Sequence, residues 1–259
     1  MSTAPLTAPA PAPALRMPRL TRGRIQVGIF LLAYLLYSLA RYVTVGNLPD
    51  ATAHARWIVD LEDSTSTNIE SNVQNALTGT PALWVLNHFY LAAQLVVLPG
   101  ALWLLYKKSQ PLYERLRNTI LATWLISIPV YALFPVAPPR LAGIGMVDTI
   151  TQQTGFAMDS SLTTKFYNEL AAVPSLHVGF AFAVGIALAA ATSNRLLKLL
   201  AHLWGPAIAL AVVATGNHFV FDIAAGMVAA AIGYGIGVFV ARGMEWRSQT
   251  SQLPALATA

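Results

Sequence analysis

The chain has 259 residues, of which 56% are hydrophobic and only 10% are charged. About a quarter of the residues of an ordinary soluble domain are charged, so this composition excludes that class and indicates a membrane protein that crosses the bilayer several times. The net charge of +5 does not indicate nucleic-acid binding, because the basic residues lie between apolar runs, and the lack of cysteine excludes disulfides, thiolate metal sites and cysteine nucleophiles.

The N-terminal segment is rich in proline and arginine up to residue 24 and apolar from residue 25. Residues 1–15 are rich in proline and alanine, and four arginines follow before the apolar run of residues 25–45. We predict a disordered cytoplasmic tail over residues 1–24. The apolar run is too long for a signal peptide, so it is predicted to be a retained first span.

Residues 46–80 are acidic and contain apolar residues at roughly helical spacing. The apolar positions are Trp57, Ile58, Leu61, Ile69, Val73 and Leu77. This pattern favours an amphipathic segment that lies against the bilayer surface, interrupted at residues 64–67. A solvated loop is the alternative.

The remaining apolar runs predict five further spans. They cover residues 81–106, 118–136, 174–191, 199–215 and 219–242. Turns are predicted at residues 107–117 and 194–198, and the long loop at residues 137–173 is expected to cover the acceptor side of a site. The predicted architecture is an all-α, six-span helical bundle over residues 25–242, followed by a cytoplasmic tail over residues 243–259.

The basic residues predict the orientation of this bundle. Twelve lysines and arginines fall on the side of the two termini, and four fall on the opposite side. By the positive-inside rule both termini are cytoplasmic. The polar residues at the starts of the fourth and sixth spans then face away from the cytoplasm, so we expect an extracytoplasmic active site.

Two of these span starts carry residues suited to catalysis. His218 and Asp222 are four residues apart, which places them on one face of a helix. A carboxylate in that position holds the Nδ1 proton of the imidazole and makes Nε2 a better nucleophile or base. His177 opens another apolar helix after Pro174 and Ser175. Ionisable groups at membrane depth are functional candidates, so the three side chains predict a catalytic site.

Arg140 is a candidate ligand for a phosphate group. It follows Pro138 and Pro139, which hold the chain extended. The planar guanidinium group binds phosphate with two parallel hydrogen bonds, and free N–H groups at helix starts also bind anions.

Four segments resemble one known family. They are VPSLH at residues 173–177, GNHFVFD at 216–222, FPVAPPR at 134–140 and LEDSTSTNIESNVQ at 61–74. Together they resemble the membrane branch of the type 2 phosphatidic acid phosphatase superfamily. The resemblance covers most of residues 25–242. It is strongest to the branch of inositol phosphorylceramide synthases (inositolphosphotransferase-like), with sphingomyelin synthases as more distant relatives.

The resemblance implies an enzyme and a mechanism. His218 would attack the phosphorus of a lipid phosphate ester and form a phosphohistidine, Asp222 would hold His218, and His177 would protonate the leaving alkoxide. Water or an alcohol would then accept the phosphoryl group. The superfamily is metal-independent, so neither a metal nor another cofactor is implied.

The chain departs from the wider family at the phosphate ligands. Val212 stands where that family has an arginine, and Ala211 replaces the preceding serine. Lys108 and Arg115 match the spacing of another family motif, but the predicted topology puts them in a cytoplasmic turn, so this match is attributed to chance.

The residues left to bind the substrate phosphate are Arg140, Ser175 and Asn217. The predicted protein is thus a lipid phosphatase or phosphotransferase of the cell membrane, and its composition is compatible with a bacterial inner membrane.

The residues also allow other interpretations. The His218–Asp222 pair is alternatively a structural hydrogen bond, and the two histidines with Asp222 are alternatively a zinc site with one open position. Arg140 is alternatively an interfacial anchor. At the level of function, the rival is a non-catalytic membrane transporter or lipid-binding protein. Transporters often show internal repeats, and this chain shows none of fixed period.

Overall fold

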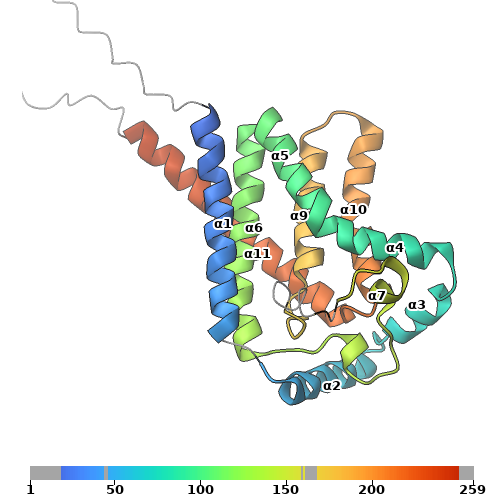
Figure 1. Cartoon of the computed structure of the whole chain (residues 1–259). Helices are drawn as coiled ribbons and strands as arrows, with labels where there is room; N and C mark the ends of the chain where they lie inside the picture. Colours follow the sequence, from blue (N-terminus) through green and yellow to red (C-terminus); the bar gives the residue numbers. More distant parts are fainter. Residues whose placement is uncertain (1–18, 44–45, 159, 161–167, 251–259) are drawn as a thin grey trace, which may run out of the picture.

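The computed structural model describes residues 19–43, 46–158, 160 and 168–250 (Figure 1). The regular secondary structure of these residues is all-helical, and one isolated parallel bridge joins Val136 to Ala171. The α-helices are α1 (Arg19–Val43), α2 (Leu48–Ser64), α3 (Glu70–Leu77), α4 (Pro81–Ala92), α5 (Leu98–Lys108), α6 (Gln110–Leu133), α7 (Thr149–Thr154), α9 (Leu176–Ala190), α10 (Arg195–Ala214) and α11 (Val220–Thr250). A π-helical turn, Ala93–Val97, joins α4 to α5, and a 3₁₀ turn covers Pro139–Leu141.

Parts of the predicted tails and of the predicted loop lie outside the described residues. These are residues 1–18, 251–259, 159 and 161–167. Helix α1 begins at Arg19, inside the predicted N-terminal tail, and α11 continues through the start of the predicted C-terminal tail to Thr250.

Four helical stretches are long and apolar enough to cross a membrane. They are Pro81–Lys108, Gln110–Leu133, Arg195–Ala214 and Val220–Val240. The other two predicted spans correspond to shorter apolar helices, Gly23–Leu39 and Leu176–Ala190. At 1.5 Å per residue, the 15 residues of α9 extend about 22 Å, which is less than the roughly 30 Å of a hydrocarbon core. Large apolar side chains are exposed on α1, α10 and α11, as expected for a membrane protein.

The predicted turn at residues 107–117 is wrong. Helix α5 runs to Lys108 and α6 begins at Gln110, so Ser109 alone separates them. Lys107 and Lys108 form the end of α5, and the other charged residues of the predicted turn lie in the first two turns of α6. Glu, Arg, Lys and Leu are good helix formers, so their charge does not end a helix. Pro111 lies in the first turn of α6, where its missing N–H breaks no helical bond.

The second predicted span is a bent helix. The π-helical turn between α4 and α5 contains one more residue than a turn of α-helix. Pro99 is the second residue after it. Figure 1 shows α4 and α5 running in different directions on either side of this turn. Helix α4 is thereby placed beside α7 and α10.

The acidic segment at residues 46–80 forms two helices, α2 and α3, which lie at the lower end of the molecule in Figure 1. The buried face of α2 is made by Ala51, Ala55, Ile58 and Glu62. These positions are spaced by four, three and four residues, which is one stripe of a helix. Trp57, which the sequence suggested for the apolar face, is half exposed. Small side chains and one carboxyl group therefore form the inner surface of α2.

Glycines allow α11 to approach its neighbours closely. A Cβ atom on Gly226 would meet the Ser175 carbonyl oxygen, and one on Gly233 would lie 2.9 Å from the Thr119 carbonyl oxygen of α6. Gly237 also faces α6, whereas a Cβ atom on Gly235 would meet nothing within 4 Å. Gly233 and Gly237 therefore allow close packing of α11 on α6, and Gly235 lies on the open side.

We expect Gly233→Ala to destabilise the fold, because its methyl group would force α11 away from α6 at a cost of about 1–3 kcal/mol. Gly235→Ala is the matched control. It should leave stability unchanged or raise it by up to about 1 kcal/mol, since alanine is the better helix former. Thermal unfolding of both variants in detergent measures the difference, and equal melting temperatures would contradict the packing described here.

Candidate active site

The predicted catalytic residues lie where four segments of the chain meet, near the lower ends of α9 and α10 in Figure 1. Backbone hydrogen bonds tie these segments together: Val136 N–H to Leu170 O (2.9 Å), Ala137 N–H to Ala51 O (3.1 Å), Arg140 N–H to Gly216 O (2.9 Å) and Ser175 N–H to Asp222 O (3.1 Å). An apolar cluster that includes Phe219, Ile58 and Val136 packs beside them. The polar residues are thus fixed by backbone bonds and by a local core.

His218 follows a tight turn at the end of α10. Gly216 has φ +72°, a left-handed conformation that glycine adopts without strain, and its N–H bonds to the Val213 carbonyl oxygen. His218 is then held by its own N–H, which donates to the Val212 carbonyl oxygen. This turn delivers the imidazole to the start of α11.

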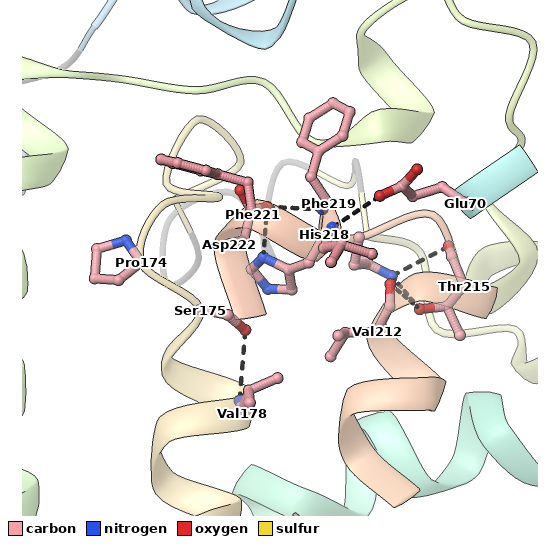
Figure 2. A network of polar contacts seen from close by, with 12 residues as sticks. Glu70, Pro174, Ser175, Val178, Val212, Thr215, His218, Phe219, Phe221 and Asp222 are labelled. Carbon is pink, nitrogen blue, oxygen red and sulfur yellow. Dashed lines mark hydrogen bonds and ion pairs between the residues drawn. The ribbon is translucent and has the colours of Figure 1, made fainter. Parts of the chain in front are cut away.

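The predicted contact between His218 and Asp222 is present. His218 Nδ1 lies 3.2 Å from Asp222 Oδ2, and both side chains are buried (Figure 2). Asp222 Oδ2 also accepts the N–H of Phe219 at 2.9 Å, whereas Oδ1 has no hydrogen-bond partner among the described residues. Because the carboxylate is fixed by the backbone, it fixes the orientation of the imidazole in turn.

Two further carboxyl groups reach the first turn of α11. Glu70 Oε1 accepts the N–H of Val220 at 2.8 Å, and Glu62 Oε1 accepts the N–H of Phe221 at 2.7 Å. Figure 2 shows Glu70 approaching this turn from α3. The first N–H groups of a helix lack partners within the helix and bind anions. At α11 the protein's own carboxyl groups take that place, so this helix start does not offer its N–H groups to a phosphate.

The environment of Glu62 changes its acidity. Burial raises the pKa of this carboxyl group from 4.5 to about 8, and the neighbouring charge of Glu70 acts in the same direction. The hydrogen bond from the Phe221 N–H opposes this shift and lowers the pKa. Glu62 therefore holds its proton at neutral pH.

His177 lies at the start of α9 and faces His218. The centroids of the two imidazole rings are 6.2 Å apart, a distance that one phosphate ester between them can bridge. The ring of Tyr90, from α4, stacks on His177 with centroids 4.0 Å apart and planes 17° from parallel. Tyr90 thereby fixes the plane in which His177 presents its nitrogens.

Arg140 lies in the 3₁₀ turn after the two prolines, with its side chain 2% exposed. One guanidinium nitrogen is 3.7 Å from Glu169 Oε1, and none of its nitrogens makes a hydrogen bond within the described residues. A buried guanidinium group with five unused donors is costly unless a ligand satisfies it. The predicted phosphate ligand therefore has its donors free.

Ser175 and Asn217 are both buried and serve the local fold. Ser175 is the N-cap of α9, and its Oγ accepts the N–H of Val178 at 3.4 Å (Figure 2). The Asn217 amide nitrogen donates to Thr215 Oγ1 at 2.8 Å, and its Oδ1 has no partner among the described residues. The free atom of Asn217 is thus an acceptor, which suits a hydroxyl group better than a phosphate oxygen. Contact of either residue with a phosphate stays a prediction.

A cavity of about 1440 Å³ ends at the two histidines. Its walls come from α1, the bent α4–α5 helix, α6 and α9, and its lining is mainly apolar. Aromatic side chains are prominent in the lining: Tyr34, Tyr37, Trp103, Tyr106, Trp124 and Tyr131. The site therefore joins a polar reaction centre to a long apolar space.

The part of the chain that the structure describes contains no group of three His, Cys, Asp or Glu side chains arranged to hold a metal ion. This finding gives the alternative zinc site no support.

Comparison with known families identifies the class of protein. A model of the PAP2 superfamily matches residues 56–236, which include both histidines, Asp222 and Arg140. The chain belongs to the PAP2 superfamily. This membership indicates a membrane protein with phosphatase or phosphotransferase activity. Comparisons with curated proteins and with solved structures gave no match.

Sequence reasoning did not single out Glu62, Glu70 or Tyr90 as site residues. A signal for Glu62 was available, because it continues the buried stripe of Ala51, Ala55 and Ile58 and so puts an acid where the pattern requires an apolar residue. Tyr90 had no comparable signal, since an aromatic residue in an apolar helix is ordinary.

We expect Tyr90→Ala to make the imidazole of His177 more accessible, because the ring of Tyr90 stacks on one face of that imidazole. The rate of His177 modification by diethylpyrocarbonate, followed by peptide mass spectrometry, should rise several-fold. Tyr90→Phe keeps the ring and serves as the control. Equal modification rates in Tyr90→Ala and the unaltered protein would show that the stack does not restrain His177.

Proposed function

We propose that this protein is an integral membrane lipid phosphatase or phosphotransferase that cleaves a lipid phosphate ester through a phosphohistidine on His218. The observation that supports it most is the joint placement of three groups around His218, which lines one apolar cavity together with His177. These groups are the His218–Asp222 pair, His177 at 6.2 Å from it, and the buried Arg140 with unused donors.

In the first step, His218 attacks the phosphorus. Its Nδ1 proton is donated to Asp222, which leaves the Nε2 lone pair as the nucleophile. A bond forms between Nε2 and phosphorus, and the bond from phosphorus to the ester oxygen breaks. Protonated His177 gives its proton to the departing oxygen, so an alcohol leaves. Arg140 donates to the phosphoryl oxygens and stabilises their charge.

In the second step, the acceptor takes the phosphoryl group. The oxygen of water or of an alcohol attacks the phosphohistidine, and neutral His177 removes the proton of that oxygen. The bond between Nε2 and phosphorus breaks, which restores both histidines. The free Asn217 Oδ1 supports a hydroxyl group as a neighbour in this step. Water as acceptor makes the enzyme a phosphatase, and a lipid or polyol hydroxyl makes it a transferase of the inositol phosphorylceramide synthase type.

The cavity supports a substrate with long apolar chains. Its volume of about 1440 Å³ exceeds the roughly 300–1,000 Å³ of ordinary small-molecule pockets. A phosphate head group at His177 and His218 places the attached chain along α1, α5 and α6.

The proposed topology keeps six spans. Four helical stretches are long enough to cross the bilayer, and the shorter apolar helices in α1 and α9 complete the bundle. The start of α9 then lies below the bilayer surface, where a lipid head group can reach His177. The distribution of basic residues supports cytoplasmic termini and a site on the extracytoplasmic face of the cell membrane. The composition is compatible with a bacterial inner membrane.

A purified sample in detergent with EDTA should release phosphate or transfer a head group from a lipid. The substrate panel holds phosphatidic acid, polyprenyl phosphates and phosphodiester lipids, each with and without an alcohol acceptor. His218→Ala should lower turnover by about 1,000-fold or more, because it removes the nucleophile. Turnover that needs an alcohol selects the transferase. Activity lost to EDTA, or full activity in His218→Ala, would contradict the proposal.

The covalent intermediate is tested separately with p-nitrophenyl phosphate, whose leaving group departs without a proton. His177→Ala should form the phosphohistidine from this ester but break it down slowly, since the second step needs His177 as a base. Mass spectrometry after an alkaline quench should find the phosphoryl group on residue 218. A phosphoryl group on another residue would contradict the assigned nucleophile.

We expect Arg140→Gln to lower kcat/KM by about 10- to 100-fold, since charge-assisted hydrogen bonds contribute about 1.5–3 kcal/mol each. Arg140→Lys should recover only part of this loss, because lysine lacks the planar fork. Arg115→Gln removes an exposed arginine from α6 and is the matched control. If Arg140→Gln and Arg115→Gln behave alike, Arg140 is an interfacial anchor rather than a phosphate ligand.

A further inference from the structure

We propose that Glu62 and Glu70 form a proton-sharing carboxyl pair that positions His218 for the reaction by holding the first turn of α11 from outside that helix. The proposal rests on the proposed function of His218 as the nucleophile. Both glutamates are positioning residues, because they reach His218 only through the backbone that follows it.

The contacts place the pair next to the nucleophile. Glu70 accepts the N–H of Val220, and Glu62 accepts the N–H of Phe221, two and three residues beyond His218. The two glutamates are 0% and 2% exposed. Their helices, α2 and α3, lie about 150 residues away in the chain, so the bonds tie two separate segments to the catalytic helix.

A shared proton would give a partner to the Oε2 atoms of Glu62 and Glu70, which do not bond to α11. Neither Glu62 Oε2 nor Glu70 Oε2 meets a donor among the described residues, and the other oxygens of these two buried carboxyl groups accept successive N–H groups of one helical turn. Two ionised carboxylates offer only acceptors, so one of the pair must carry the proton. With a proton between them, the groups form one bridge that connects α2, α3 and α11.

The charges around this pair act in a consistent direction. Glu62 faces Glu70 on α3 and Asp222 on α11, and both negative charges favour its protonated form. On the other side of Asp222, His218 faces His177 of α9, and Arg140 is paired with Glu169. The pKa of Glu62, raised to about 8 chiefly by burial, places the loss of the shared proton just above neutral pH.

The consequence for the reaction follows from the sign of this shift. Below about pH 8 the pair holds its proton and the first turn of α11 is fixed. Above that pH the two carboxylates repel each other, the bridge separates, and His218 loses its fixed position. The same shift makes the folded state less stable as the pH rises from the ordinary carboxyl pKa of 4.5 towards 8, because over that range the folded state retains a proton that the unfolded chain releases.

The test is the pH profile of kcat/KM between pH 6 and 10 for Glu62→Gln. The glutamine keeps an acceptor for the Phe221 N–H and always offers a donor to Glu70, so it imitates the protonated pair. We expect activity within a few-fold of the unaltered protein at pH 7, and retention of that activity above pH 8, where the unaltered protein loses about tenfold per pH unit. Glu62→Ala should lose at least tenfold at every pH. Asp60→Asn, on the exposed side of α2, is the matched control.

An alkaline loss in Glu62→Gln that equals that of the unaltered protein would overturn the proposal. A second measurement does not depend on finding a lipid substrate. The melting temperature of the unaltered protein should fall between pH 6 and 9, and that of Glu62→Gln should stay nearly constant. Failure of the lipid assays would contradict the proposed function alone, whereas equal melting profiles would contradict the shared proton whatever the substrate.

Discussion

The structure depends on which groups accept hydrogen bonds from the backbone N–H groups of the first turn of α11. The backbone N–H groups at the start of a helix have no partners within it, and buried polar groups without partners are costly. At α11, Asp222, Glu70 and Glu62 accept the N–H groups of residues 219–221 in order. Because two of these acids come from α2 and α3, the helix that follows His218 is correctly held only when those short amphipathic helices are in place. His218 and the segment of α2 and α3 therefore form one structural unit.

This arrangement also separates the charges of the site. The start of α11 already holds acidic groups, so the positive partner for a substrate phosphate has to come from elsewhere. In the proposed site Arg140 provides it from the 3₁₀ turn after Pro138 and Pro139, and the bond from its N–H to the Gly216 carbonyl oxygen holds it close to His218. Val212, which replaces the arginine of the wider family, is fully buried at the end of α10 and packs in an apolar cluster. The proposed phosphate ligand therefore lies in a turn between helices and not on α10.

The sequence predicted the features that depend on local spacing. The interval of four residues between His218 and Asp222 predicts their contact, which the structure contains. Features that depend on partners distant in the chain were not predicted. The apolar content of residues 81–106 does not reveal a π-helical turn, and the charges of residues 107–117 do not reveal that they are helical. The burial of Glu62 was not predicted, because its partner N–H lies 159 residues further along the chain.

The first helix has a special place in this arrangement. The match to the PAP2 superfamily begins at residue 56, so α1 lies wholly outside it. Yet α1 forms one wall of the cavity that leads to the histidines, with Phe30, Tyr34 and Tyr37 among its lining residues. The part of the chain that matches the superfamily carries His177, His218 and most of the cavity lining, whereas α1 contributes its wall from outside that match. Under the proposed function, a change in α1 would therefore alter how the substrate's chain fits its wall of the cavity and leave His177 and His218 in place.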